Sequence, residues 1–224
     1  MQGSPDTGSR KACAPAGAAA GLLASLRLHH SPSWRHSLRV SAVARQVARA
    51  YGVGGKGAAE IEAGSRLHDI GKLRVPRALL AKPSALDDGE ERWMRTHPEW
   101  GLYLIRVRAG GSLETAARIA SAHHERWDGA GYPARLRGLG IPFEARIAAV
   151  ADAYDALRSP REYKPAGPHG EAMERIAAAS GSHFDPEVAE TLAGCQDLVE
   201  RRWEEAYAEM PEADLTPESD VSPV

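Results

Sequence analysis

The chain has 224 residues, of which 43% are hydrophobic and 26% charged, so its size and composition are those of a globular protein with one sizeable core. A net charge of −2 provides no field that would gather nucleic acid or an anionic membrane, so phosphate binding needs locally placed cations. No apolar run reaches the ~20 residues of a transmembrane helix, and two cysteines offer no disulfide framework. We therefore expect a cytoplasmic protein with neither a membrane nor a nucleic-acid partner.

Residues 1–30 are rich in Gly, Ser, Pro and Ala without a sustained period, and we expect them to form a disordered leader. Ser33 is a plausible N-cap, and order is expected to begin there. The residues that follow recur at helical spacing on one face: His36, Val40 and Val47. His36 therefore lies on the buried stripe, where a histidine is more often a hydrogen-bonded core residue than a metal ligand.

A second helix is predicted to run up to Leu67 and to end at the pair His68-Asp69. Gly71 and Pro76 forbid much continuation, so Asp69 should lie at or just past the helix end. Taken alone, the pair is typical of a helix end with a surface histidine and a capping aspartate. Whether the pair is instead a set of metal ligands depends on the other histidines of the chain.

His97 is expected at a junction between two helices. It follows Trp93 by four residues, which is one helical turn, and Pro98 is expected to open the next helix. Another predicted helix ends in the doublet His123-His124. Neighbouring residues on a helix point about 100° apart, so adjacent ligands cannot share one helical face. At a helix end the backbone turns, and both side chains can then converge on one point.

Between residues 126 and 142 helical periodicity gives way to glycines, which indicates an ordered loop, with a small hairpin near Leu136 to Ile141. From Pro142 onward a helix is apolar on nearly every side and is predicted to be buried. An ionised Asp152 inside such a helix is costly unless a partner compensates its charge. Asp152 therefore calls for a cation or a metal.

Residues 161–165 form a predicted basic turn, and a helix is expected from about 170 to 179. Asp185 then starts a last long helix, with Cys195 on its apolar stripe. Residues 208–224 are acidic and contain prolines, which favours a disordered tail. No alternating β pattern stands out, so the predicted fold class is all-α.

Imidazole nitrogen and carboxylate oxygen suit iron, manganese or zinc, and the chain offers several such groups. Both adjacent pairs of ligand-type residues fall at predicted helix ends, where they can converge. The candidate metal ligands are His36, His68, Asp69, His97, His123, His124 and Asp152.

Three segments carry a resemblance to a known family: His68-Asp69-Ile70-Gly71-Lys72, the run from His123 to Pro133, and the run from Ala151 to Leu157. Together they resemble the HD-GYP family of phosphohydrolases, a branch of the HD superfamily. The match extends from roughly His36 to the segment 182–186. It implies a bacterial, all-α helical bundle of the HD superfamily, spanning residues 31–207. It also implies a metal-dependent phosphodiesterase that opens cyclic di-GMP to pGpG or GMP.

The resemblance also implies how the ligands divide between two metals, with Asp69 bridging. One metal would take His36, His68, Asp69 and Asp152, and the other His97, His123 and His124. Some family members carry a glutamate four residues before the first histidine, where it helps to bind a third metal. Pro32 occupies that position here, so we predict two metals, with iron or manganese expected and zinc left open.

Two such cations would share a hydroxide that attacks phosphorus, with Asp69 and Lys72 as the catalytic residues. Lys72, Arg161 and Lys164 are the candidates for contacts to the substrate phosphate. For Arg161 and Lys164, the alternative is a basic turn that faces solvent.

Tyr132 lies in the Gly131-Tyr132-Pro133 segment, and it would shape the substrate pocket or a docking surface for a diguanylate cyclase (GGDEF) partner. It could equally pack under its own loop. Two other functions stay open for the whole chain. One is an HD phosphohydrolase that acts on another nucleotide, such as cyclic GMP-AMP or a nucleotide phosphate. The other is a non-catalytic module that senses cyclic di-GMP.

Overall fold

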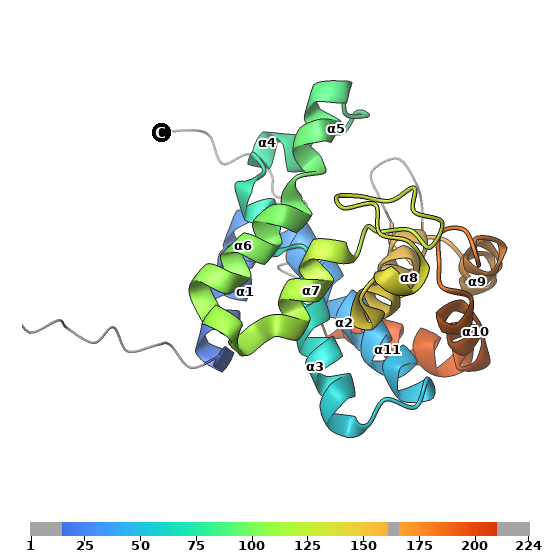
Figure 1. The fold of residues 1–224 in the computed structure, drawn as a ribbon. Coiled ribbons are helices and arrows are strands. Elements are labelled where there is room, and N and C mark those ends of the chain that lie inside the picture. The colour runs from blue at the N-terminus through green and yellow to red at the C-terminus, as the bar shows by residue number, and fades with distance from the viewer. Residues whose placement is uncertain (1–14, 161–165, 210–224) are drawn as a thin grey trace, which may run out of the picture.

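The computed structural model describes residues 15–160 and 166–209, which form a bundle of helices (Figure 1). The prediction of an all-α fold is confirmed, since these ranges contain no β-strand and only one isolated bridge. The α-helices are α1 (Pro15–His29), α2 (Ser31–Ala50), α3 (Gly55–Ser65), α4 (Arg77–Leu80), α5 (Asp88–Met94), α6 (His97–Ala109), α7 (Glu114–Ala122), α8 (Phe143–Arg158), α9 (His169–Ala178), α10 (Pro186–Gly194) and α11 (Gln196–Ala208). Short 3₁₀ helices are η1 (Ile70–Arg74), η2 (Gly110–Leu113) and η3 (Gly138–Gly140).

The two largest hydrophobic clusters of the described residues hold the bundle together. The larger joins α2, α3 and α8 to the C-terminal helices α9, α10 and α11, with Ile147 and Tyr154 of α8 fully buried within it. The smaller joins α1, η1, α6 and α7 around Leu67 and Ile105. The predicted metal ligands come from elements of both clusters, so the candidate site lies between them.

The prediction of a disordered leader over residues 1–30 is wrong for Pro15–His29, which form α1. Leu22 and Leu26 lie one turn apart on this helix, and both are buried in the smaller cluster. Alanine has the highest helix propensity, so the Ala-rich composition that suggested disorder supports a helix once these leucines find a surface. At the end of α1, His29 Nε2 donates a hydrogen bond to the Val75 carbonyl at 2.9 Å.

Two further predictions are corrected by the structure. The expected last long helix is two helices, because α10 ends at Gly194 and the chain turns at Cys195 before α11. Glycine weakens a helix interior, which explains the break. The hairpin expected near residues 136–141 is the 3₁₀ turn η3 instead.

Arg161 and Lys164 lie outside the described residues.

A search of the described helices for one that is both long and apolar enough to cross a bilayer finds none.

Acid should weaken the start of α2, because His30 caps this helix with a neutral imidazole. Its Nδ1 accepts a hydrogen bond from the Ser33 backbone N–H at 3.2 Å. Burial, with a smaller effect of the Lys72 charge, lowers the pKa of His30 from 6.5 to about 4. The unfolded chain therefore takes up this proton first, and stability falls as the pH decreases from about 6.5 towards 4.

A His30→Asn variant keeps a side-chain acceptor at the cap but cannot be protonated. We expect its free energy of unfolding, measured by urea denaturation, to decrease less than that of wild type between about pH 6.5 and 4.5. The other histidines are common to both proteins, so the difference isolates His30. Parallel losses in the two proteins would contradict the prediction.

Candidate metal centre

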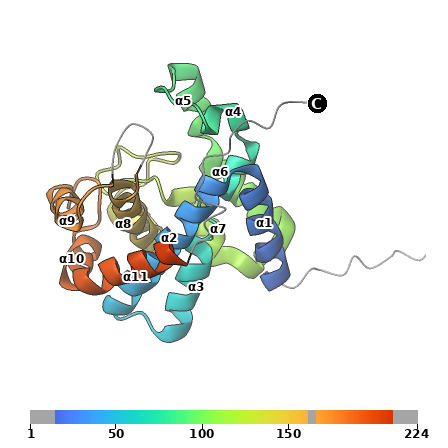
Figure 2. The same ribbon diagram turned by 180° about the vertical axis from the view of Figure 1, so that it is seen from behind.

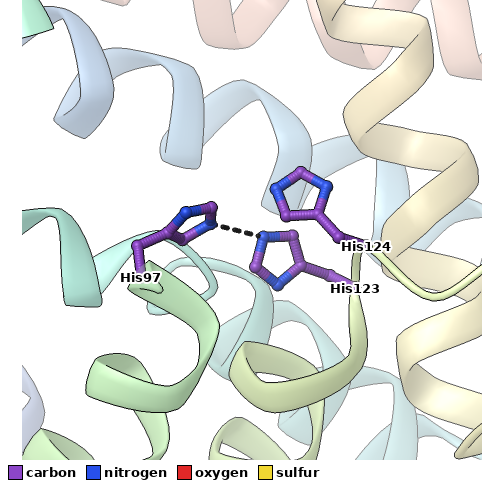
Figure 3. Close-up of side chains that lie close together, drawn as sticks. All are labelled: His97, His123 and His124. Atoms are coloured by element: carbon purple, nitrogen blue, oxygen red, sulfur yellow. Dashed lines mark hydrogen bonds between the residues drawn. The ribbon is translucent and has the colours of Figure 1, made fainter. Parts of the chain in front are cut away.

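The seven candidate ligands come together from α2, the turn after α3, the start of α6, the end of α7, and α8. Two groups are formed, and in each the ligand atoms lie within 4.8 Å of one another. Asp152 adjoins the first group, since its Oδ1 lies 3.0 Å from His36 Nε2. Figure 3 shows the second group, in which the rings from the start of α6 and the end of α7 face each other. The first group contains His36, His68 and Asp69, and the second contains His97, His123 and His124.

Three of the histidines share one local arrangement. In each, Nδ1 lies within hydrogen-bond distance of the backbone carbonyl three residues earlier, at or near the end of a helix. The distances are 2.7 Å for His68 to Ser65, 2.7 Å for His97 to Met94, and 3.0 Å for His123 to Ala120. A carbonyl accepts only, so each Nδ1 carries the proton and donates it. Each Nε2 is thereby left with a lone pair.

These lone pairs lack suitable partners within the described part of the chain. His68 Nε2 is buried without a hydrogen bond. His97 Nε2 and His123 Nε2 lie 3.2 Å apart, the contact dashed in Figure 3, although neither nitrogen carries a proton when Nδ1 does. Buried acceptors that face each other are unfavourable unless a cation lies between them. The donor set therefore fits a divalent metal.

Asp69 divides its two carboxylate oxygens between the two groups. Oδ2 lies 3.5 Å from His68 Nε2 and 3.8 Å from His36 Nε2. Oδ1 lies 3.3 Å from His97 Nε2 and 3.9 Å from His123 Nε2. Asp69 is 1% exposed, so these imidazoles and not water surround it. Each carboxylate oxygen of Asp69 thus faces one of the two groups of histidines.

The surroundings of Asp69 hold it as a carboxylate. Burial raises its pKa, but the Lys72 ammonium and the neighbouring histidines more than offset this effect, and the pKa lies well below its ordinary value. Lys72 Nζ lies 2.5 Å from Asp69 Oδ2, with the lysine side chain 21% exposed. Lys72 is thus in contact with both the candidate bridge and solvent.

The two groups differ in how readily they would accept a metal near neutral pH. Burial lowers the pKa of His97 to about 3, that of His124 to about 4, and that of His123 well below its ordinary value. These imidazoles are neutral and available as ligands. For His36, burial lowers the pKa, but hydrogen bonds to Asp152 and Asp155 raise it to about 9. A metal at the first group must therefore displace a proton.

Asp152 was predicted to lie buried in an apolar helix and to need a cationic partner. The helix is α8, and the Asp152 side chain is 21% exposed and pairs with His36. We assigned no role from the sequence to Asp155, which lies one turn further along α8. Its buried Oδ2 lies 2.6 Å from His36 Nδ1. The signals for it were its spacing of three residues from Asp152 and its place in the segment from Ala151 to Leu157 that carries the family resemblance.

The loop after His124 is held in place by hydrogen bonds to Glu125, a residue to which we assigned no role from the sequence. Glu125 is 2% exposed, and its carboxylate accepts hydrogen bonds from the backbone N–H groups of Ala134 and Leu136 at 2.7 and 3.0 Å. Within this loop the Tyr132 ring stacks on His124, with centroids 4.8 Å apart. Tyr132 therefore lies beside the second group, and its ring is half-buried there.

Metal binding should stabilise the fold, because the ligands come from both hydrophobic clusters. We expect Mn²⁺ added to chelator-treated protein to raise the melting temperature. At a free concentration of 100 Kd the gain would be about 2.7 kcal/mol for one site. Differential scanning fluorimetry measures this, with Ca²⁺ as the control, since calcium prefers an all-oxygen ligand set. Equal melting temperatures with and without Mn²⁺ would count against a metal centre here.

Comparison with known proteins places this geometry in a family. A family model described as "HD domain" matches residues 22–188. The chain is 39% identical over 157 residues to "3'3'-cGAMP-specific phosphodiesterase 2" of Vibrio cholerae serotype O1, covering 70% of this chain and 30% of that protein. It is 42% identical over 154 residues to "Cyclic di-GMP phosphodiesterase response regulator RpfG" of Xanthomonas campestris pv. campestris, covering 69% of this chain and 41% of that protein.

A solved structure supports the fold. The HD domain of the L. monocytogenes phosphodiesterase PgpH, in complex with cyclic-di-AMP, aligns with a TM-score of 0.59 at 17% identity, over 85% of this chain and 99% of that one. The chain spans less than half the length of the two relatives above. The family model covers about three quarters of the chain and includes all seven candidate ligands. The chain therefore belongs to the HD domain family, as the resemblance of its motifs predicted.

Proposed function

We propose that this chain is a metal-dependent phosphodiesterase that hydrolyses cyclic di-GMP to pGpG or GMP. The observation that carries the proposal is the division of the Asp69 oxygens between two groups of histidines. Two relatives at 39% and 42% identity are named phosphodiesterases of cyclic dinucleotides, which supports the same class of substrate.

Two divalent ions, iron or manganese, would supply Lewis-acid stabilisation of phosphate charge and would lower the pKa of a water molecule. We assign His36, His68 and Asp152 to one of them, and His97, His123 and His124 to the other, with Asp69 held by both. The Nδ1 hydrogen bonds fix the ring orientation of His68, His97 and His123 before any ion arrives, which reduces the ordering cost of binding.

Positive charge for the substrate phosphate would come from Lys72, whose ammonium lies beside Asp69 and is partly exposed. Arg161 and Lys164 remain proposed phosphate contacts. For Tyr132 we infer a place in the pocket wall in preference to a docking surface for a GGDEF partner, because its ring stacks on His124.

The test is hydrolysis of cyclic di-GMP by protein reconstituted with Mn²⁺, or with Fe²⁺ under anaerobic conditions, followed by chromatography of the products. Elemental analysis of the same samples gives metals per chain. We expect turnover with about two metals bound. Protein that binds no divalent metal and leaves cyclic di-GMP intact would overturn the proposal, whereas metal binding without turnover would favour a sensing module.

The second candidate substrate is 3'3'-cGAMP, favoured by the relative whose name gives that specificity. Parallel assays at equal concentrations of both dinucleotides separate the two. Cyclic di-GMP should have the higher kcat/KM if the first proposal is right.

A further inference from the structure

Helix α11 reaches the candidate metal centre through one tryptophan. The family model ends at residue 188, whereas Trp203 lies on α11, which packs against α2 (Figure 2). The indole N–H of Trp203 donates a hydrogen bond to Asp155 Oδ1 at 2.5 Å. Trp203 is 6% exposed and Asp155 1%, so water does not compete for this contact.

Asp155 accepts hydrogen bonds on both oxygens. Oδ1 accepts from Trp203 and from Arg39 Nε at 2.6 Å, and Oδ2 accepts from Arg39 Nη2 at 3.0 Å. Arginine and tryptophan have no acceptor, so their contacts keep Asp155 an acceptor on both sides. His36 Nδ1, 2.6 Å from Oδ2, must then donate as well.

The donation from Nδ1 decides which nitrogen of His36 can bind a metal. With its proton on Nδ1 the ring presents Nε2, which lies 3.0 Å from Asp152 Oδ1 and 3.8 Å from Asp69 Oδ2. A carboxylate behind a ligating histidine fixes the ring and strengthens it as a ligand. In His68, His97 and His123 the partner of Nδ1 is instead a backbone carbonyl.

We propose that Trp203 is a positioning residue for the metal centre: through Asp155 it holds His36 with Nε2 directed at the metal. The C-terminal helix is then part of the site although it contributes no ligand. This inference rests on the metal ligation proposed above, but it concerns binding and does not require a particular substrate.

The test is Trp203→Phe, which keeps an aromatic ring under Arg158 and beside Tyr207 while removing the N–H donor. Titration of metal-free protein with Co²⁺, followed by absorption and calorimetry, reports each site separately. We expect affinity for the His36 group to fall about 10- to 100-fold, the range typical for loss of such supporting partners, with the other group unchanged.

Asp155→Asn provides a second variant. In place of Oδ1 the NH₂ group would face the Trp203 and Arg39 N–H donors, which cannot become acceptors. In place of Oδ2 it would face Arg39 and His36, and the His36 ring can adapt by moving its proton from Nδ1 to Nε2. We expect a larger loss of affinity at the same group than in Trp203→Phe. Circular dichroism of both metal-free variants checks that they are folded.

Val199→Ala is the matched control. Val199 is buried on α11, as Trp203 is, but its side chain has no group that could donate a hydrogen bond to Asp155. It should lower the melting temperature through a cavity and leave Co²⁺ affinity unchanged. The proposal is overturned if Trp203→Phe binds Co²⁺ like wild type, or if Val199→Ala weakens binding to the same extent. Because binding is the readout, a failure of cyclic di-GMP hydrolysis alone would leave this inference intact.

Discussion

Asp69→Asn should remove at least one of the two metals and most of the phosphodiesterase activity while leaving the protein folded. The amide oxygen could still bind a metal at one group of histidines. The NH₂ group, which would face the other group, is a hydrogen-bond donor and cannot bind a cation. Lewis-acid stabilisation contributes several kcal/mol to such reactions, and each ~1.4 kcal/mol is a factor of ten, so we expect a loss of kcat on the order of 10³-fold or more. Elemental analysis should show at most about one metal per chain.

Asp185→Asn is the matched control for this variant. Asp185 is also buried, and its Oδ2 pairs with Arg146 Nη1 as Asp69 Oδ2 pairs with Lys72. It lies outside both groups of candidate ligands. We expect Asp185→Asn to lower stability but to retain metal and turnover. If Asp69→Asn kept its full metal content, the bridging assignment would be wrong.

Gly71→Ala should destabilise the fold and displace His97. A Cβ at Gly71 would lie 1.8 Å from the His97 carbonyl oxygen and 2.6 Å from the Gly101 backbone nitrogen. These are backbone atoms at the start of α6, so no side chain can rotate away to make room. We expect a loss of about 3 kcal/mol or more in the free energy of unfolding, at the upper end for overpacked sites. Chemical denaturation with guanidinium measures this loss.

The metal content of Gly71→Ala adds a second readout. Because η1 and α6 would be pushed apart, the distance between Asp69 and His97 should grow and the second group should lose affinity. Gly170→Ala is the control, since a Cβ there meets nothing within 4 Å. That variant should be no less stable than wild type, with a gain of up to about 1 kcal/mol because Gly170 lies in α9, and it should have the same metal content. Similar behaviour of the two variants would show that the close approach at Gly71 has no role.

Much of the site was predictable because its residues follow local rules. The pair His68-Asp69 and the doublet His123-His124 were expected at helix ends, and α3 and α7 do end within three residues before them. His97 was expected at a helix junction and is the first residue of α6. In such positions a periodic pattern that stops is itself the signal.

Other features depend on tertiary contacts that no local pattern encodes. Gly71 was interpreted as a helix terminator, yet a 3₁₀ helix continues through it, and its lack of a side chain serves the contact with α6. Helix α1 was missed because Leu22 and Leu26 have meaning only against a distant cluster. Trp203 lies 48 residues from Asp155, and an indole on a core stripe gives no hint of its hydrogen-bond partner.

The carbonyl groups that orient His68 and His123 have a consequence for the order in which the site is assembled. Helices α3 and α7 both direct their C-terminal ends at the centre, and each such end carries roughly half a negative charge. The carboxylates of Asp69 and Asp152 add to this potential. In the empty centre the Lys72 ammonium and the His36 imidazolium offset these two carboxylates, so no excess of positive charge is left to hold a phosphodiester. Two divalent ions would supply that charge, so they must enter before the substrate can bind.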